Sequence, residues 1–257
     1  MQHSTLQSPS LVIRLGRSVQ TFLAHDASTG TDEVGTHETN IGMSVPANLR
    51  EAFRTQPLLS RDYASVTVLA DVDVLVMPED EFEEADSSTI YRHTFSGHDN
   101  DVVRHCPLER LHAVALLGLE RDLLTVMSDH YPHAVFLPVC LPVWEHFSQQ
   151  GETSRQRLYG YFYDERLCVF SFSKSRMKFC NTFSATHAHD ALFYLLSVFS
   201  QMGMKADRDE VVLLGTTPQQ KWISDSLLGY VQRVERGDIP LPSSLPLDMT
   251  LFFPPQP

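Results

Sequence analysis

The pentapeptide THAHD, at residues 186–190, is the stretch with the clearest potential for metal chemistry. Two histidines and an aspartate are side chains that zinc accepts as ligands. The surrounding pattern places them in the first turn of a helix, where residues two apart point about 200° away from each other. Only His187 and Asp190 would share a face, no third ligand is recognisable, and the helix dipole stabilises Asp190 there. We therefore expect a structural role and no metal site.

Two strand–turn–strand stretches offer a second kind of chemistry, the binding of an anion at a turn. They read SLVIRLGRSVQTFLAHD at residues 10–26 and RLYGYFYDERLCVFSF at residues 157–172. In both, residues alternate with the period of two that is typical of strands. The first turn brings Arg14, Gly16 and Arg17 together, and the second contains Asp164. The repeat predicts two related halves.

Charged residues are unevenly distributed along the chain. The segment PEDEFEEAD, at residues 78–86, has six carboxylates and no basic residue. Basic residues gather around the second hairpin instead: Arg155, Arg157, Arg166, Lys174, Arg176 and Lys178. Such runs are commonly solvated faces, and this is the interpretation we favour. The alternative is that the basic hairpin receives an anion or an acidic partner.

Composition excludes several classes of protein. The 257 residues are 42% hydrophobic and 20% charged, as in a globular protein with a substantial core. A net charge of −12 argues against a general nucleic-acid binder, because such binding needs clustered Lys and Arg. No apolar run approaches the ~18 residues that indicate a membrane span, and the N-terminal sequence does not resemble a secretory signal. The four cysteines have no C-x-x-C spacing, which favours reduced thiols and a cytoplasmic location.

The elements that position these turns follow one order in each half. In the first half, strands at 11–16 and 18–24 precede a loop over 26–40 and a helix from Pro46 to about Gln56. Two strands (SVTVLA and DVLVMP), an acidic helix opened by Pro78, two further strands and a helix at 119–129 follow. The apolar run AVFLPV predicts a strand covered on both faces, and a short helix ends near Gly151.

The second half repeats this order more plainly. Three strands lead to a long helix over 186–203, which Thr186 can cap and Gly203 can end. Its apolar stripe is widened by Phe193 and Tyr194. The buried strand VVLLG follows, and then Thr217-Pro218 as the cap and first turn of another helix. Each half is thus a strand meander followed by a helix and a parallel strand, which predicts a duplicated α/β fold with mixed sheets.

Domains are expected at 10–150, with an α/β insertion around 62–107, and at 151–236. A proline-rich tail, extended along the surface, is expected at 237–257.

This order resembles the halves of the actin/hexokinase/heat-shock ATPase superfamily, which are ribonuclease H-like. The chain is most similar to an uncharacterised bacterial family, a domain of unknown function assigned an actin-like ATPase fold. The similarity extends over roughly residues 10–235 and is carried by three stretches: LVIRLGRSVQTFLAHD, SVTVLADVDVLVMPEDEF, and MKFCNTFSATHAHDALFYLLSVFSQMGM with VVLLG after it. The resemblance implies ATP bound between the halves, with an acidic residue at each hairpin turn holding Mg²⁺ through water.

The chain departs from that superfamily pattern at both turns. Arg14 stands where the first acid is expected, and bulky aromatic residues precede Asp164. The adenosine-side loop keeps only Gly215 of the usual pair of glycines. ATP as a cofactor is therefore disfavoured, ATP hydrolysis is not expected, and no catalytic residue is assigned.

We interpret the chain as a non-catalytic actin-like module that binds a protein partner not identified by the sequence. One alternative is a nucleotide-binding ATPase or sugar-kinase relative with a degenerate site. Another is a sensor that binds a small anion through Arg14, Arg17 and the basic second hairpin. Any retained ligand site is expected in the crevice between the halves, where the helix N-terminus after VVLLG offers N–H groups to an anion. The residues predicted for it are Arg14, Gly16, Arg17, Asp164, Gly215, Thr216 and Thr217.

Overall fold

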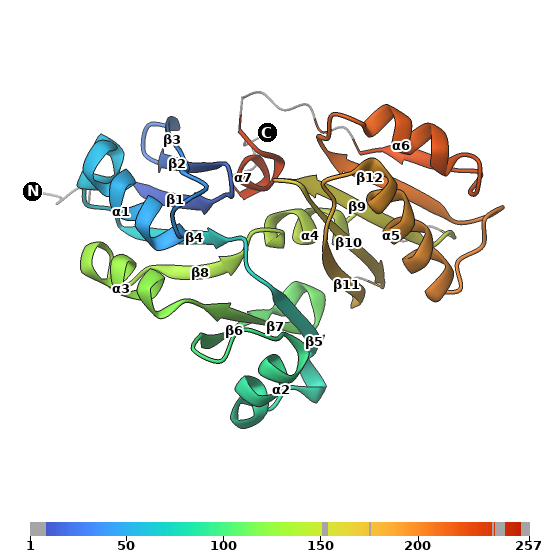
Figure 1. The fold of residues 1–257 in the computed structure, drawn as a ribbon, viewed down its shortest axis with the longest axis horizontal. Helices are drawn as coiled ribbons and strands as arrows, with labels where there is room; N and C mark the ends of the chain where they lie inside the picture. Colours follow the sequence, from blue (N-terminus) through green and yellow to red (C-terminus); the bar gives the residue numbers. More distant parts are fainter. Residues whose placement is uncertain (1–8, 151–153, 175, 238, 240–244, 253–257) are drawn as a thin grey trace, which may run out of the picture. The chain divides into compact units, whose positions relative to one another are not determined.

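The computed structural model of the chain describes residues 9–150, 154–174, 176–237, 239 and 245–252 (Figure 1). The chain divides into two compact units, each assembled from separate segments of the sequence. The first unit comprises residues up to 72 together with 88–104 and 117–139. The second comprises 73–87, 105–116 and the chain from 140 onward. Compared with the predicted boundaries, residues 140–150 and part of the insertion therefore group with the second half.

A five-stranded sheet with the order β3-β2-β1-β4-β8 forms the first unit. The first three strands are an antiparallel meander, and β4 and β8 continue the sheet in parallel with β1. Alternate apolar residues of β1, β2 and β4 form one core with the buried sides of α1 and α3. These elements are β1 (Ser10–Leu15), β2 (Val19–Asp26), β3 (Thr31–Glu38), α1 (Val45–Thr55), β4 (Ser65–Ala70), α3 (Arg121–His130) and β8 (Val135–Pro138).

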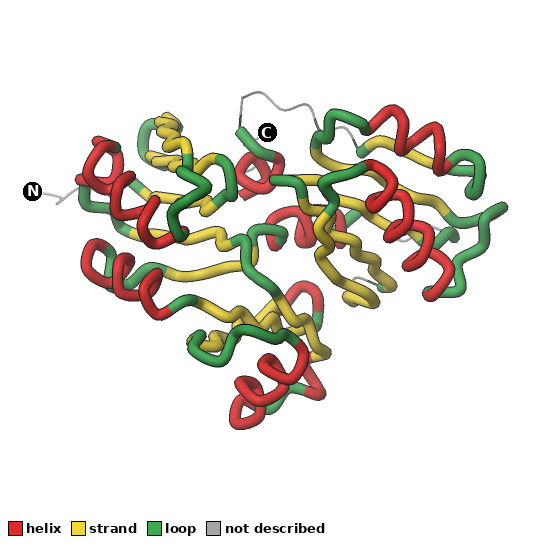
Figure 2. The backbone as a smooth tube through the Cα atoms, in the orientation of Figure 1, coloured by secondary structure: helices red, strands yellow, loops and turns green. Residues whose placement is uncertain are grey.

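The second unit repeats this arrangement in a sheet with the order β11-β10-β9-β12-β13. Again three antiparallel strands are followed by two strands parallel to the first of them. Helices α5 and α6 share a core with β9, β10 and β12, and Figure 2 shows the two helices beside this sheet. The elements are α4 (Leu141–Ser148), β9 (Arg157–Tyr163), β10 (Arg166–Ser173), β11 (Arg176–Ser184), α5 (Ala188–Gln201), β12 (Glu210–Gly215), α6 (Gln220–Leu227), β13 (Val234–Arg236) and α7 (Leu247–Phe252).

The inserted region builds a third sheet with the order β5-β7-β6. Its elements are β5 (Val74–Pro78), α2 (Ser87–Thr94), β6 (Val102–Leu108) and β7 (Ala113–Leu119). The predicted acidic helix beginning at Pro78 is wrong. The chain there forms two short 3₁₀ turns, at Glu79–Glu81 and Glu84–Asp86, and α2 begins only at Ser87. Six carboxylates within nine residues repel one another, and this repulsion disfavours a continuous helix.

Two strands of the first sheet also differ from the sequence-based prediction. Residues 31–38 form β3, not part of a loop, and their polar side chains point to solvent from a sheet edge. Backbone pairing with β2 holds this strand, so it needs no alternation of apolar residues. The run AVFLPV forms the opposite edge, β8, where Val135 is 55% exposed. Its apolar character therefore does not reflect cover on both faces.

The helices of the second unit begin later than predicted. His187, not Thr186, is the N-cap of α5, and α6 begins at Gln220 and not at Thr217-Pro218. Leu195 is fully buried as predicted, but Phe193 is 65% exposed and widens no buried stripe. The helix ends before Gly203, whose positive φ of 67° reverses the chain.

The predicted extended tail contains a helix. Leu247, Asp248, Met249 and Thr250 of α7 are buried, and α7 packs against α4. Residues 238, 240–244 and 253–257 of the predicted tail lie outside the described residues. The short helix predicted to end near Gly151 is α4, which ends at Ser148.

A buried carboxylate joins the starts of two neighbouring strands in the second unit. Asp209, before β12, accepts hydrogen bonds from Arg208 Nε at 2.9 Å and from the backbone N–H of Gln156 and Lys205. Hydrogen bonding from the Arg208 guanidinium is the main cause that lowers the pKa of Asp209 from 3.8 to about 2. The folded state therefore binds this proton less readily than the unfolded state.

We expect part of the stability of the chain to be lost as the pH falls from about 4 to about 2. Well above pH 4, Asp209 is ionised in both states and its stabilisation is complete. As the pH falls, the unfolded state takes up the proton first, and the stabilisation is fully lost once the folded form is protonated too. Because Arg208 is half exposed to solvent, we expect a contribution of about 1–2 kcal/mol. Urea unfolding at pH 6 and pH 3 should show a smaller pH-dependent loss for Asp209→Asn than for wild type. The exposed Asp225→Asn is the control, and equal losses in all three chains would contradict the assignment.

Candidate functional site

The first hairpin turn holds a carboxylate that the sequence-based prediction missed. Asp71 directly follows β4, and the parallel register that pairs Leu15 with Ala70 brings it beside Gly16. The side chain of Asp71 is only 2% exposed, and its Oδ2 lies 3.5 Å from Arg17 Nε. An acid therefore reaches the first turn from the neighbouring strand. The sequence signal that could have found Asp71 is its position directly after a buried parallel strand. Ligands bind parallel sheets at the carboxyl ends of the strands.

The two arginines of this turn have different environments. Arg14 is 3% exposed and belongs to the packed sheet, whereas the side chain of Arg17 is 57% exposed. Gly16 is buried between them. The turn is fastened by Thr39, whose hydroxyl donates to the carbonyl of Arg17 and whose N–H donates to Ser18. The structure thus does not present Arg14 and Arg17 as an exposed pair for an anion.

The second hairpin turn is a tight two-residue turn. Asp164 and Glu165 have φ values of 42° and 61°, and Tyr163 pairs directly with Arg166. Positive φ at both central residues is the geometry of a type I′ turn. The carbonyl of Glu165 accepts a hydrogen bond of 2.8 Å from the N–H of Ala185. A turn of this length leaves no loop that could wrap around a phosphate group.

Aromatic side chains fill the space beside this turn within the second unit. Tyr161 and Tyr163 are 1% and 7% exposed, and their rings stack at 5.1 Å. The Tyr161 hydroxyl donates a 2.9 Å hydrogen bond to Asp248 Oδ2 of α7. These tyrosines are part of the core and do not line an open site.

The loop after β12 contains the remaining predicted residues. Gly215 has a φ of 73°, and a Cβ atom there would lie 2.2 Å from the carbonyl oxygen of Phe162. Close passage of β9 therefore explains this glycine without a ligand. Thr216 is exposed, and Thr217 lines a small pocket.

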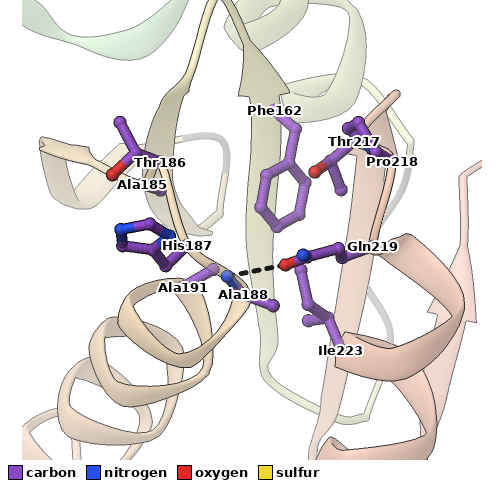
Figure 3. A pocket seen from close by; sticks show the side chains of 10 residues that line it. All are labelled: Phe162, Ala185, Thr186, His187, Ala188, Ala191, Thr217, Pro218, Gln219 and Ile223. Carbon is purple, nitrogen blue, oxygen red and sulfur yellow. Dashed lines mark hydrogen bonds between the residues drawn. The ribbon is translucent and has the colours of Figure 1, made fainter.

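The small pocket lies where the loop before α6 meets the start of α5 (Figure 3). Its volume is about 90 Å³, below the roughly 300–1,000 Å³ of small-molecule sites. Figure 3 shows Gln219 reaching across, and its Oε1 accepts a 2.9 Å hydrogen bond from the N–H of Ala188. One N–H group at the start of α5 is thereby already satisfied. The lining residues are Phe162, Ala185, Thr186, His187, Ala188, Ala191, Thr217, Pro218, Gln219 and Ile223.

Two arginines of the basic cluster around the second hairpin form ion pairs within the protein. Arg157 pairs with Glu210, and Arg166 pairs with Asp73 at 3.0 Å. Lys174, Arg176 and Lys178 remain exposed near the turn between β10 and β11. The cluster is therefore not a single anion-binding surface.

A second pocket, of about 230 Å³, lies between α1 and α3 of the first unit. Phe53 stacks on His130 at 3.7 Å, and His130 Nδ1 lies 3.0 Å from the carbonyl oxygen of Val126. Arg54 and His130 stand in the last turns of their helices, where basic side chains complement the helix dipole. We interpret these residues as structural.

The described part of the chain holds no group of three His, Cys, Asp or Glu side chains arranged for a metal ion. In THAHD, the carbonyl of His187 accepts the N–H of Asp190, as at the start of a helix. Among the described residues, no helix is long and apolar enough to cross a membrane.

Comparison with solved structures identifies the fold. A Bacteroides thetaiotaomicron protein, described as having an actin-like ATPase fold and unknown function, matches with a TM-score of 0.88 at 22% identity over 98% of both chains. A chain of the PilM-PilN type IV pilus biogenesis complex matches with a TM-score of 0.57 at 13% identity, over 90% of this chain and 89% of the other. The predicted fold of duplicated, actin-like α/β halves is therefore confirmed.

Comparison with curated protein sequences gave no significant match. Residues 2–234, by contrast, match the profile of a family described as "Protein of unknown function (DUF3822)". This match covers most of the chain and agrees with the resemblance inferred from its motifs. The chain belongs to the DUF3822 family.

Proposed function

We propose that the chain is a non-catalytic module that binds another protein through the α5–α6 surface, defined as His189, Phe193 and Trp222. The observation that carries this proposal is the exposure of large aromatic side chains on adjacent helices. Phe193 and Trp222 are 65% and 40% exposed. His189 lies one helical turn before Phe193, and its ring centroid is 4.6 Å from that of Trp222. The rings of His189 and Trp222 therefore lie side by side, and Phe193 extends this exposed side of α5 by one helical turn.

Aromatic residues in such a position favour binding to a protein. Exposed apolar patches commonly mark interaction sites, and tryptophan is enriched among the residues that dominate binding energy. The fold core does not require these rings, because Ala191, Leu195 and Ile223 of the same helices fill it. A chain of similar fold is present in the PilM-PilN complex, which supports the use of this fold for protein binding.

The geometry of the turns supports a non-catalytic role. The second turn is too short to wrap a phosphate, and packing explains Gly215 without a nucleotide. All four cysteines are free thiols, three of them buried, which fits our further proposal that the protein acts in the cytoplasm.

Substitution of the aromatic surface tests the proposal. We expect Phe193→Ser/Trp222→Ser to weaken partner binding at least tenfold, because the loss of two aromatic anchors typically exceeds about 1.4 kcal/mol. The matched control is Val34→Ser/Ile41→Ser, which removes two exposed apolar side chains from the first unit. Proteins from the source cell that wild type and control retain, but the variant loses, would be purified and their Kd measured by calorimetry.

A partner that binds all three chains equally would contradict the α5–α6 surface as the binding site. So would the absence of any protein that distinguishes the variant from the control. Thermal melting of each chain would show that the substitutions leave the fold intact.

The alternative function is that of a nucleotide-binding ATPase or sugar-kinase relative with a degenerate site. The observation in its favour is Asp71, which supplies a carboxylate at the first turn. Calorimetric titration with Mg-ATP and ADP, and an assay of Mg-dependent hydrolysis, separate the two functions. We expect no turnover above background. Hydrolysis that disappears in Asp71→Asn or Asp164→Ala would establish the enzyme instead.

A further inference from the structure

Cysteines of β10 and β11 lie on one face of the second sheet. Leu167 and Val169 of β10 point into the core that α5 and α6 share, so Cys168 between them points to the opposite face. Cys168 pairs directly with Thr182 of β11. Cys180 lies two residues before Thr182 on that strand and therefore points to the same face as Cys168. The two cysteines are diagonal neighbours on adjacent strands.

A third thiol, Cys140, approaches this face from α4. Helix α4 packs here, because the ring centroid of Phe147 lies 5.3 Å from that of Tyr159, which is on the same face of the sheet as Cys168. Cys140 is the N-cap of α4, and its thiol donates a hydrogen bond to the sulfur of Cys168. Cys140 and Cys168 are 3% and 0% exposed, whereas Cys180 on the edge strand β11 is partly exposed. We call Cys140, Cys168 and Cys180 the thiol cluster.

Cys168 is the most readily ionised member of the thiol cluster. Burial by itself raises the pKa of Cys168, but hydrogen bonds donated to its sulfur outweigh burial and lower this pKa well below its usual range. Their donors include the Cys140 and Cys180 thiols and the Thr182 hydroxyl. The pKa of Cys140 is raised mainly by burial, and that of Cys180 mainly because it donates to Cys168. Since the thiolate is the reactive form, Cys168 is the nucleophile of the cluster.

A buried indole group supports this assignment. Trp144 is 1% exposed, and its Nε1–H has no hydrogen-bond partner among the described residues. Trp144 lies one helical turn after Cys140, and its indole favours the charged form of Cys168. A buried donor without an acceptor is destabilising, and a charged Cys168 sulfur supplies that acceptor.

Strand geometry decides which thiol can form a bond with Cys168. Diagonal neighbours on adjacent antiparallel strands have Cα atoms about 7–8 Å apart, beyond the roughly 4.4–6.8 Å that a disulfide spans. Cys180 is therefore badly placed for a disulfide with Cys168. Cys140 is not held by strand pairing, because it lies directly before α4, and its sulfur is already hydrogen-bonded to that of Cys168.

We propose that the thiol cluster is an oxidation site, at which Cys168 reacts with hydrogen peroxide and then forms a disulfide with Cys140. The Cys168 thiolate attacks one peroxide oxygen. An S–O bond forms, the O–O bond breaks, and the hydroxide that leaves takes up the proton that Cys168 lost. The Cys140 sulfur then attacks the sulfenic acid: an S–S bond forms, the S–O bond breaks, and hydroxide leaves as water with the Cys140 proton. Two electrons thus pass from the two sulfurs to the peroxide.

The disulfide acts on the segment with which the chain enters the second unit. The long C-terminal segment of that unit begins at Cys140, directly after Val139 of the first unit. A bond from Cys140 to β10 fastens this segment to the second sheet. The partly exposed Cys180 gives a small oxidant access to the cluster. This proposal does not depend on the α5–α6 surface.

The wild-type chain provides the first test, because trypsin separates all four cysteines. They fall, one each, in peptides 105–110, 122–155, 167–174 and 179–205. The reduced chain is treated with hydrogen peroxide and denatured, its remaining thiols are alkylated with iodoacetamide, and the digest is analysed by mass spectrometry. We expect the peptides of Cys140 and Cys168 to form one linked species, which dithiothreitol separates. Cys106 and Cys180 should remain alkylated.

Variants test the order of the two steps. In Cys140→Ser no linked species should form, and the sulfenic acid of Cys168 should persist and be trapped by dimedone. The matched control is Cys106→Ser, which removes a buried thiol outside the cluster and should form the disulfide as wild type does. Burial raises the pKa of Cys106 to about 11. We therefore expect Cys168 to react with peroxide at least tenfold faster than Cys106.

Three outcomes would overturn the proposal. In the first, all four cysteines of the treated wild type remain alkylated. In the second, Cys168 is linked to Cys180, which would assign the disulfide to the two adjacent strands. In the third, Cys106 is oxidised as fast as Cys168, which would show that the cluster has no special reactivity. The wild-type digest decides all three, so the test does not require that a variant folds.

Discussion

Replacement of Leu195 by alanine is expected to lower the free energy of unfolding by about 2–5 kcal/mol. Leu195 is fully buried where α5 meets the second sheet. Alanine would lose the transfer free energy of the removed methyl and methylene groups and would leave a cavity that a close-packed core fills only in part. Urea unfolding measures the change, and a loss below about 1 kcal/mol would mean that α5 is peripheral to the fold.

Two controls make this measurement specific. Phe193→Ala, on the exposed side of the same helix, should cost less than about 0.5 kcal/mol. Gly160→Ala should cost about 1–3 kcal/mol, because the new Cβ would lie 2.9 Å from Leu195 Cδ2. In the Leu195→Ala background the added methyl group enters the vacated space. The double variant should therefore be more stable than the sum of the single changes predicts.

The sequence predicts most of this fold because the strands of the duplicated hairpins are rich in apolar residues that point alternately to the two faces of a sheet. Leu11, Ile13 and Leu15 face one core, and Leu158 and Phe162 face another. Prediction fails where backbone pairing alone holds a strand, as in β3, whose side chains are polar and exposed. It also fails for α7, because a helix of only six residues is stabilised by its packing against α4 and not by its own periodicity.

The candidate site was less predictable, because its partners are distant in the sequence. Asp71 reaches Arg17 only through the parallel register of β1 and β4, and Asp73 reaches Arg166 across 93 residues. A hairpin pattern gives the residues of a turn but not the acids that neighbouring strands bring to it. The positive φ values of Asp164 and Glu165 could not be predicted from the sequence either, since turns with this geometry favour Asn-Gly or Asp-Gly.

Gly215 was predicted as a ligand-binding residue, and its replacement by alanine is expected to destabilise the chain strongly. We expect Gly215→Ala to lower the free energy of unfolding by about 3–4 kcal/mol. A side chain at a φ of 73° is strained by itself. The Cβ would also stand 2.2 Å from the Phe162 carbonyl oxygen, a backbone atom fixed by the pairing of β9 with β12. Relief of this contact requires the two central strands of the second sheet to separate.

Gly203 separates these two causes within the same unit. Its φ is 67°, close to that of Gly215, but a Cβ there would meet no atom within 4 Å. Gly203→Ala therefore reports the backbone strain alone, and we expect it to cost about 1 kcal/mol. The excess loss in Gly215→Ala measures the contact with Phe162. Equal losses of unfolding free energy in the two variants, measured by urea unfolding, would show that β9 and β12 move apart without destabilising the fold. In that case packing would not explain Gly215, and a ligand that approaches this loop closely would again be a reason for the glycine.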